Sequence, residues 1–233
     1  MTRVAGVDGC VAGWVAVILE GGAFAEARLA ARFADLLDDP ARVIGVDIPL
    51  GSCGFPRTAD VAARNLLGRR RSSVFDPPPP EVLDATDLAT ANRMTRATYG
   101  RGVSAQAWTL RTKMRDVEPH WHAAPDRIVE VHPEVTFREL GDGQPMAHAK
   151  RTWAGVRERT ALLARAGIEL PDDLGASGDA GADDVLDAAV VAWTAARRGH
   201  CEKHPESARG RRRGPASRDL VLITRGRTRH RRA

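Results

Sequence analysis

The sequence predicts an α/β fold with a mixed five-stranded sheet, three antiparallel strands first, and helices on both faces. Three apolar runs separated by glycine-containing turns open the chain, at residues 4–7, 14–19 and 24–29, which is typical of an antiparallel meander. Two later apolar runs, at 43–46 and 128–131, are separated by long segments of helical periodicity. Apolar strands that alternate with helices indicate an α/β protein.

Between the strands, local residue patterns predict the connections. Gly21 and Gly22 supply a hairpin turn between the second and third strands. The expected helices cover residues 32–37, 58–67, 81–98, 107–117, 152–166 and 183–198. A proline-rich loop is expected at 72–80, and a surface loop around His120 and His122. Asp183 is the expected N-cap of the last helix.

The composition favours a protein with one sizeable core. The chain has 233 residues, of which 43% are hydrophobic, enough for one domain over residues 1–199. No apolar run approaches the roughly 18 residues of a membrane span, and no secretory signal is recognisable, so we expect a cytoplasmic protein without a membrane partner. The three cysteines form no Cys-x-x-Cys pair, which argues against a disulfide framework or a structural zinc site.

The positive charge is concentrated at the C-terminus. From Arg197 to the end there are 13 Lys or Arg and three acidic residues, whereas the rest of the chain carries 22 basic and 27 acidic residues. Residues 200–233 are therefore expected to form a basic, disordered tail. Such a tail could add salt-dependent affinity for nucleic acid, or it could simply reflect an arginine-rich composition.

Six acidic residues are expected to gather at one edge of the sheet. Two end apolar strands, two lie in or just after the fifth strand, and two share a face of the last helix. They are Asp8, Asp47, Glu130, Glu134, Asp184 and Asp187. Carboxylates this close would repel each other unless cations neutralised them. Their oxygens suit Mg²⁺ or Mn²⁺, and two such ions about 4 Å apart support phosphodiester hydrolysis.

These acidic residues also have structural interpretations. The dipole of a helix favours acidic residues in its first turns, which would account for those of the last helix without a metal. Asp8 precedes a glycine and could begin a turn. Asp47 lies in an apolar run and needs a partner if it is buried. The order of the elements, more than any one residue, favours the metal site.

Seven motifs occur in order between residues 6 and 195. They are GVDGCVAGWVAV (6–17), GVDIPLG (45–51), RTADVAARNLLGRRRSSVF (57–75), VSAQAW (103–108), VEVHPEVTF (129–137), KRTWAGVRERTALL (150–163) and DDVLDAAVVAWTA (183–195). Together they resemble an uncharacterised prokaryotic family, catalogued as a domain of unknown function and described as predicted RNase H-like nucleases. The resemblance implies a ribonuclease H-like fold in which the last helix supplies Asp-x-x-Asp.

The resemblance also implies a role for each acidic residue. Asp8 would be the metal ligand of the first strand, and Asp47 the carboxylate of the fourth strand. Asp184 and Asp187 would be the last-helix pair, and their spacing leaves open which of them dominates. All six acidic residues are then candidate catalytic groups, with Mg²⁺ or Mn²⁺ as cofactor.

Other motif residues are candidates for binding the substrate. Glu130 and Glu134 match the family's fifth-strand motif, and His132 between them could move a proton or lie beside the metal, or only shape the strand exit. Arginine forks and hydroxyls suit phosphate oxygens. The remaining candidates are Arg57, Arg64, Ser72, Ser73, Lys150 and Arg159. The arginines of 57–71 could instead form a solvated helix face, and Lys150 and Arg159 could only pair with acidic residues.

Three functions are consistent with these patterns. The first is a metal-dependent nuclease acting on nucleic acid, with DNA or RNA and the oligomeric state left open. The second is nucleotide phosphate binding of the actin-like or sugar-kinase type, where a first-strand Asp precedes a glycine-containing hairpin. The third is a non-enzymatic nucleic-acid-binding protein in which the basic tail supplies affinity.

Overall fold

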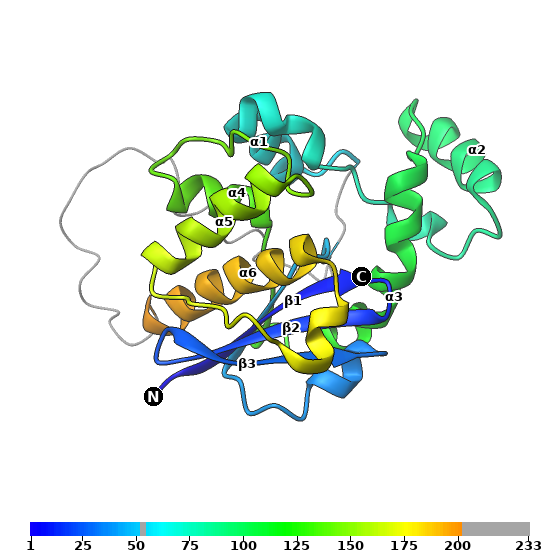
Figure 1. The fold of residues 1–233 in the computed structure, drawn as a ribbon. Coiled ribbons are helices and arrows are strands. Elements are labelled where there is room, and N and C mark those ends of the chain that lie inside the picture. The colour runs from blue at the N-terminus through cyan, green and yellow to red at the C-terminus, as the bar shows by residue number, and fades with distance from the viewer. Residues whose placement is uncertain (52–54, 202–233) are drawn as a thin grey trace.

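A five-stranded mixed sheet forms the centre of the computed structural model, which describes residues 1–51 and 55–201 (Figure 1). Its strands are β1 (Arg3–Cys10), β2 (Gly13–Glu20), β3 (Ala23–Ala30), β4 (Val43–Val46) and β5 (Ile128–Glu130). Their order is β3-β2-β1-β4-β5, with antiparallel pairing among the first three strands and parallel pairing of β1 with β4 and of β4 with β5. The predicted sheet is thus confirmed. The predicted tail lies outside the described residues, apart from the last two residues of the final helix.

Tight turns and complete burial explain why the strands could be recognised. Gly21 and Gly22 join β2 to β3 with φ angles of 64° and 94°, in the left-handed region that glycine adopts without a steric cost. Residues 14–19 of β2 and all of β4 are buried. Strands covered on both faces have no polar side to present, so they occur in the sequence as continuous apolar runs.

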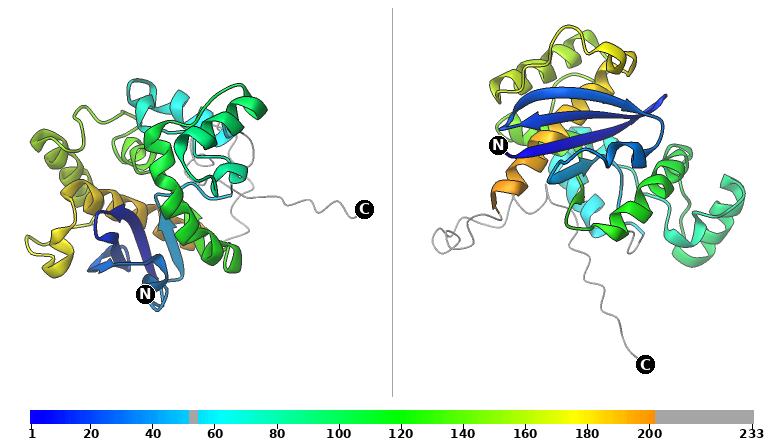
Figure 2. Two further views of the ribbon diagram at one scale, coloured as in Figure 1. Left: turned by 90° about the vertical axis from the view of Figure 1, so that its right-hand side faces the viewer. Right: turned by 90° about the horizontal axis from the view of Figure 1, so that it is seen from below.

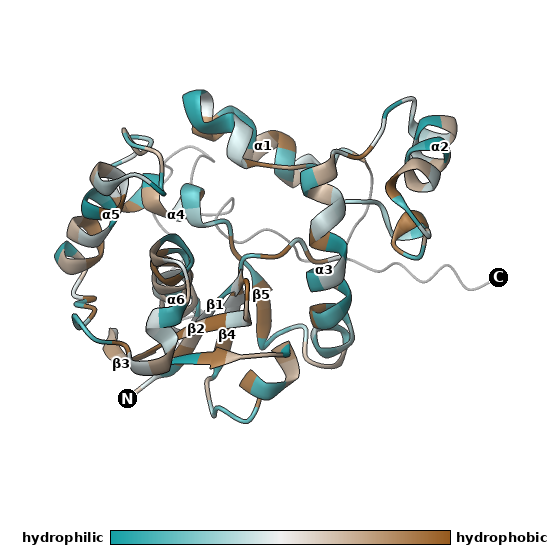
Figure 3. Ribbon diagram, turned by 45° about the vertical axis from the view of Figure 1, so that its right-hand side comes forward, coloured by the Kyte–Doolittle hydropathy of each residue, from teal (hydrophilic) through white to brown (hydrophobic). Residues whose placement is uncertain are grey.

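Helices cover both faces of the sheet. On one face, α6 (Ala182–Cys201) crosses β1, β2 and β4, and α4 (Pro133–Leu140) and α5 (Trp153–Arg165) pack outside it (Figures 1 and 2). On the other face, the short helix η1 (Phe33–Leu36) and α3 (Ala105–Ala123) pack over Trp14 of β2. The apolar strands therefore lie between two helical layers, and the brown colour on β4 and β5 in Figure 3 marks their hydrophobic residues.

Two glycines let α6 approach the sheet closely. Gly6 of β1 pairs with Gly45 of β4. A Cβ atom on Gly6 would lie 2.2 Å from the carbonyl oxygen of Ala188 and 2.1 Å from the amide nitrogen of Ala192, and one on Gly45 would lie 2.7 Å from Val191. Because backbone atoms of α6 occupy the space of a side chain at Gly6, no residue larger than glycine fits there.

We expect Gly6→Ala to lower the free energy of unfolding by roughly 1–3 kcal/mol or more, since overpacking of a close-packed site forces the backbone to move. The methyl group would push α6 away from β1. Gly22→Ala is a suitable control, because nothing lies within 4 Å of its Cβ position and only the φ strain remains. Urea unfolding of both variants checks this, and equal stability of wild type and Gly6→Ala would contradict the close approach.

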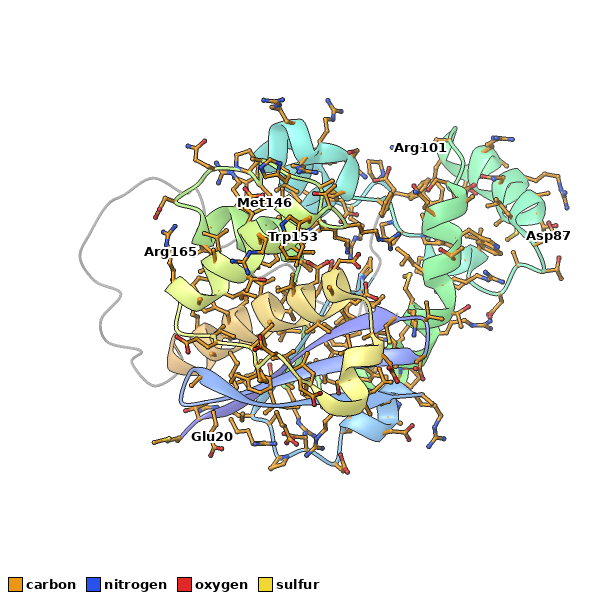
Figure 4. All side chains as sticks on the ribbon, viewed as in Figure 1. Glu20, Asp87, Arg101, Met146, Trp153 and Arg165 are labelled. Carbon is orange, nitrogen blue, oxygen red and sulfur yellow. The ribbon has the colours of Figure 1, made fainter. Side chains whose placement is uncertain are left out.

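The remaining helices lie between β4 and α6 in the sequence. They are α1 (Thr58–Leu67), η2 (Gly68–Ser73), η3 (Pro80–Val82), α2 (Leu88–Tyr99) and η4 (Gly175–Asp179). A small separate cluster of buried residues, including Phe55, Val82 and Trp108, joins α2 to the start of α3. Asp87 begins α2 by accepting a hydrogen bond from the Thr90 N–H at 2.7 Å (Figure 4).

Four local predictions are wrong or incomplete. The helix expected at 81–98 is divided into η3 and α2, because Asp87 caps a new start. The loop expected around His120 and His122 is instead the last turn of α3, which continues through Pro119. The loop expected at 72–80 begins inside η2. α6 begins at Ala182, so Asp183 lies inside its first turn and is not the N-cap.

Among residues 1–51 and 55–201, no helix has both the length and the apolar character that crossing a membrane requires.

Candidate metal centre

Three carboxylates from distant parts of the chain meet at one edge of the sheet. Asp8 lies in β1, Asp47 directly follows β4, and Asp187 lies in the second turn of α6. Each supplies an oxygen, and the three oxygens lie within 4.8 Å of one another. We call Asp8, Asp47 and Asp187 the carboxylate triad. Its spacing is compatible with a shared divalent cation, whose oxygen ligands surround it at 2.0–2.6 Å.

The backbone fixes the positions of the triad. The Asp47 N–H donates to the carbonyl oxygen of Val7 at 3.0 Å, which extends the parallel β1–β4 ladder to the level of Asp8. The Gly9 N–H donates to Oδ1 of Asp8 at 2.7 Å. Asp187 directly precedes Ala188, whose carbonyl faces Gly6. The close approach of α6 to β1 thus brings the third carboxylate to the other two.

The triad carries unfavourable negative charge. Burial, together with the charges of Asp47 and Asp187, raises the pKa of Asp8 well above its usual range. Withdrawal from water and the charge of Asp187 likewise raise the pKa of Asp47. Burial raises the pKa of Asp187 to about 6, against the opposing effect of Lys150. Each proton or cation that binds here relieves repulsion.

One cation of the chain already contacts the triad. Nζ of Lys150 donates to Oδ2 of Asp187 at 2.6 Å and lies 3.5 Å from Oδ2 of Asp183. Burial lowers the pKa of Lys150, but the charge and hydrogen bond of Asp187 have the larger combined effect with the neighbouring acidic residues, so the pKa lies above its usual value. Lys150 is therefore a counterion of Asp187 and Asp183. Pairing with acidic residues was one of the two roles that the sequence left open for it.

Asp184 lies outside the triad, although its spacing from Asp187 predicted a shared site. It is half-buried, and burial and the charge of Asp183 raise its pKa. Asp183 accepts a hydrogen bond from Nε of Arg151 at 2.9 Å. Of the last-helix pair, Asp187 is thus the member that the structure places against Asp8 and Asp47.

Glu130 belongs to a separate buried ion-pair cluster. Arg57 donates to both of its oxygens, at 2.7 and 2.9 Å, and also to both oxygens of Asp60, at 2.7 and 2.9 Å. The Leu50 N–H adds a further hydrogen bond to Glu130 at 2.8 Å. The fork of Arg57 is therefore occupied by two protein carboxylates, and both predicted site residues hold the loop after β4 against β5.

Glu134 and Arg159 form a second buried pair. Arg159 is fully buried and donates from Nη2 to Oε1 of Glu134. Oε2 of Glu134 and Nδ1 of His132 are buried and have no hydrogen-bond partner within the described part of the chain. Burial lowers the pKa of His132, which favours the neutral imidazole. Pro133 begins α4 instead of extending the strand, a role that proline fills well at a first helical position.

The other predicted substrate residues make their hydrogen bonds outside the triad. Arg64 donates to Asp76 at 2.6 Å and to the carbonyl oxygen of Val74 at 3.2 Å. Ser72 is exposed. Ser73 donates to the carbonyl oxygen of Arg70 at 2.8 Å and lines the cavity described next.

A cavity of about 260 Å³ lies beside the triad. Its lining includes Asp47, Asp187 and Lys150 as well as Arg57, Glu130, His132, Glu134 and apolar residues. This space, which we call the triad cavity, is thus shared by the carboxylate triad and the fifth-strand motif.

The family model described as "Protein of unknown function (DUF429)" matches residues 6–209. The chain belongs to the DUF429 family. No curated protein and no solved structure matches it significantly. The expected membership in a family of unknown function is therefore confirmed.

One residue of this DUF429 chain near the triad was missed by the sequence interpretation. Lys113 of α3 donates to the carbonyl oxygen of Gly13 and lies 4.3 Å from the centre of the Trp14 ring. Its Cε atom would be 3.3 Å from a Cβ on Gly9, next to Asp8. Burial lowers the pKa of Lys113. No motif marks it, because its place depends on how α3 packs against the β1–β2 turn.

The carboxylate triad should make the metal-free protein less stable as pH rises. Asp187 has a pKa of about 6 when folded and an ordinary value of 3.8. The folded state thus holds this proton more tightly, and its stabilising contribution is lost as pH rises from about 4 through 6, by up to about 3 kcal/mol. In EDTA, we expect the stability of Asp187→Asn relative to wild type to increase over this interval. Denaturant unfolding at pH 4, 5, 6 and 7.5 measures it, and a pH-independent difference would contradict the raised pKa.

Proposed function

We propose that this protein is a metal-dependent nuclease with a ribonuclease H-like fold. The observation that carries the proposal is the carboxylate triad, in which Asp8, Asp47 and Asp187 bring oxygens within 4.8 Å of one another from three separate elements. Three buried or half-buried carboxylates with Lys150 as their one contacting cation among the described residues are costly unless they bind further positive charge. A functional site that needs their charge gives a reason for that cost.

The arrangement of elements supports the finer fold assignment. Three antiparallel strands come first, a parallel strand that is followed by an aspartate pairs with β1, and a last helix brings a third aspartate across the sheet. The resemblance of the seven motifs implies the same order of ligands. The ribonuclease H-like assignment rests on this agreement between motif order and topology.

The residues present fit a divalent cation. Their donors are hard carboxylate oxygens, and Oδ1 of Asp187 is buried without a hydrogen-bond partner among the described residues. Asp8, Asp47 and Asp187 would hold Mg²⁺ or Mn²⁺. When bound, such ions lower the pKa of a water and neutralise phosphate oxygens in phosphodiester hydrolysis.

The chain's own groups prepare this site. The Gly9 N–H orients the Asp8 carboxylate, and Lys150 holds Asp187. Lys150 also lines the triad cavity, so it would supply positive charge to a phosphate bound there.

The test is isothermal titration of Mn²⁺ and Mg²⁺ into the full chain, followed by cleavage assays on single-stranded and duplex DNA and RNA. Because some two-metal sites assemble only with substrate, the titration is repeated with a non-cleavable phosphorothioate oligonucleotide. We expect metal binding and metal-dependent cleavage. Salt-sensitive oligonucleotide binding without either would instead favour the binding protein, and stabilisation by ATP alone would favour the nucleotide-binding alternative.

A further inference from the structure

The triad cavity is lined by two unlike kinds of residue. Asp47, Asp187 and Lys150 belong to the carboxylate triad and its counterion, and further charged or polar residues come from the Arg57–Glu130 and Glu134–Arg159 clusters. The remaining lining is apolar and comes from the loop after β4, the residues after η2, α3 and the segment from β5 into α4. Its apolar residues are Ile48, Pro49, Val74, Phe75, Leu110, Val131 and Pro133. A phosphate would remain beside the charged residues, so the apolar part of the lining suits a different part of a substrate.

The size of the cavity limits what can enter. Its volume of about 260 Å³ lies just below the roughly 300–1,000 Å³ of sites that enclose drug-sized ligands. One ring system fits such a space, whereas a base pair or a length of duplex does not.

Two residues that line the cavity each have a buried polar atom without a hydrogen-bond partner within the described ranges, Nδ1 of His132 and Oε2 of Glu134. Buried polar atoms without partners are uncommon in folded proteins and call for a reason. A planar ring with hydrogen-bonding groups on its edge would fill the apolar space and bring polar groups to these residues, whereas a sugar would bring more hydroxyls than the apolar lining can satisfy.

We propose that the triad cavity binds one unpaired nucleobase of the substrate beside the scissile phosphate. This inference rests on the proposed function and narrows it to substrates in which a base can leave the helical stack. Enzymes that act on an unpaired base enclose it between apolar side chains and bind its hydrogen-bonding edge. Single strands, loops and frayed ends should therefore be preferred to intact duplex.

The deciding experiment compares two ligands that differ only by the base. Adenosine 5′-monophosphate, and then the guanosine, cytidine and uridine analogues, are titrated against ribose 5-phosphate with the full chain. Each titration is done in Mn²⁺ and again in EDTA. A bound base contributes about 1–3 kcal/mol, so we expect at least one nucleotide to bind roughly tenfold more tightly than ribose 5-phosphate. Equal affinities, or no binding of any nucleotide at millimolar concentration, overturn the proposal.

A pair of variants locates the effect. Leu110→Trp should fill the cavity from α3 and remove the preference for the base, whereas Thr109→Trp places the same side chain at the neighbouring exposed position and should keep it. Thermal unfolding confirms that both variants fold. If Leu110→Trp folds and keeps the full preference, the base binds elsewhere and the proposal is wrong. If Leu110→Trp does not fold, the ligand comparison on the wild type decides alone.

The outcomes separate this proposal from the proposed function. Base-selective binding without metal-dependent cleavage would retain the base site and refute the nuclease. Metal-dependent cleavage with equal affinity for the nucleotides and ribose 5-phosphate would retain the nuclease and refute the base site.

Discussion

Asp8→Asn should abolish metal-dependent cleavage while leaving the protein at least as stable as wild type in EDTA. Loss of an outer-shell partner of a metal typically costs 10- to 100-fold, so loss of a ligand should cost more than about 100-fold in turnover or metal affinity. The asparagine Oδ1 can still accept from the Gly9 N–H. Because the variant also removes one buried charge from a crowded triad, its free energy of unfolding without metal should not fall.

Asp184→Asn is the matched comparison for this variant. It removes a half-buried carboxylate that lies outside the triad, so its effect on metal affinity should be smaller. The measurements are metal titration, cleavage rate at saturating Mg²⁺ or Mn²⁺, and urea unfolding in EDTA. Wild-type turnover in Asp8→Asn, or a loss of stability in EDTA, would assign Asp8 a structural role and remove the triad from the mechanism.

Arg57→Met should destabilise the protein by about 3–5 kcal/mol, because it leaves Glu130 and Asp60 buried without their cation. All three side chains are at most 8% exposed, so water cannot replace the lost partner. Arg64→Met, in α1, is the control and should cost less, since its pair with Asp76 is more exposed and Asp76 keeps Arg101 as a second partner.

This prediction also separates two roles for Arg57. If the residue acts by holding the loop after β4, the triple variant that replaces Arg57, Asp60 and Glu130 with apolar residues should recover stability. Denaturant unfolding measures both steps. A stable Arg57→Met variant with weakened oligonucleotide binding would instead support the substrate contact that the motif resemblance implied.

The central strands could be predicted because burial on both faces leaves continuous apolar runs in the sequence, whereas the edge strand β3, with no buried residue, was indicated by its glycine turn and partial alternation. Most helices were indicated by their periodicity. β4 and α1 have the predicted limits, since both are bounded by abrupt changes of residue type. α4 could not be predicted, because a proline after an apolar strand is compatible with either a strand exit or a helix start. α3 continues through Pro119, where the usual expectation is that the helix ends.

The candidate site was predictable in its residue types but not in its pairings. Asp8 and Asp47 could be placed at one sheet edge from the strand pattern alone. The choice between Asp184 and Asp187 depends on the position of α6 along β1. The three-residue spacing of the two aspartates does not determine that position. The bonds between Arg57 and Glu130 span 73 positions in sequence, and no local pattern encodes such a partner.

The triad draws its members from residues 8, 47 and 187, and the last of these lies on the helix that closes one face of the sheet. During synthesis, the first two carboxylates leave the ribosome long before the third. A nascent chain that ends before α6 therefore lacks the complete carboxylate triad, however well its first strands have paired. Under the proposed function, metal binding would be a late event in biogenesis, and Mg²⁺ would stabilise only chains that have been finished and folded.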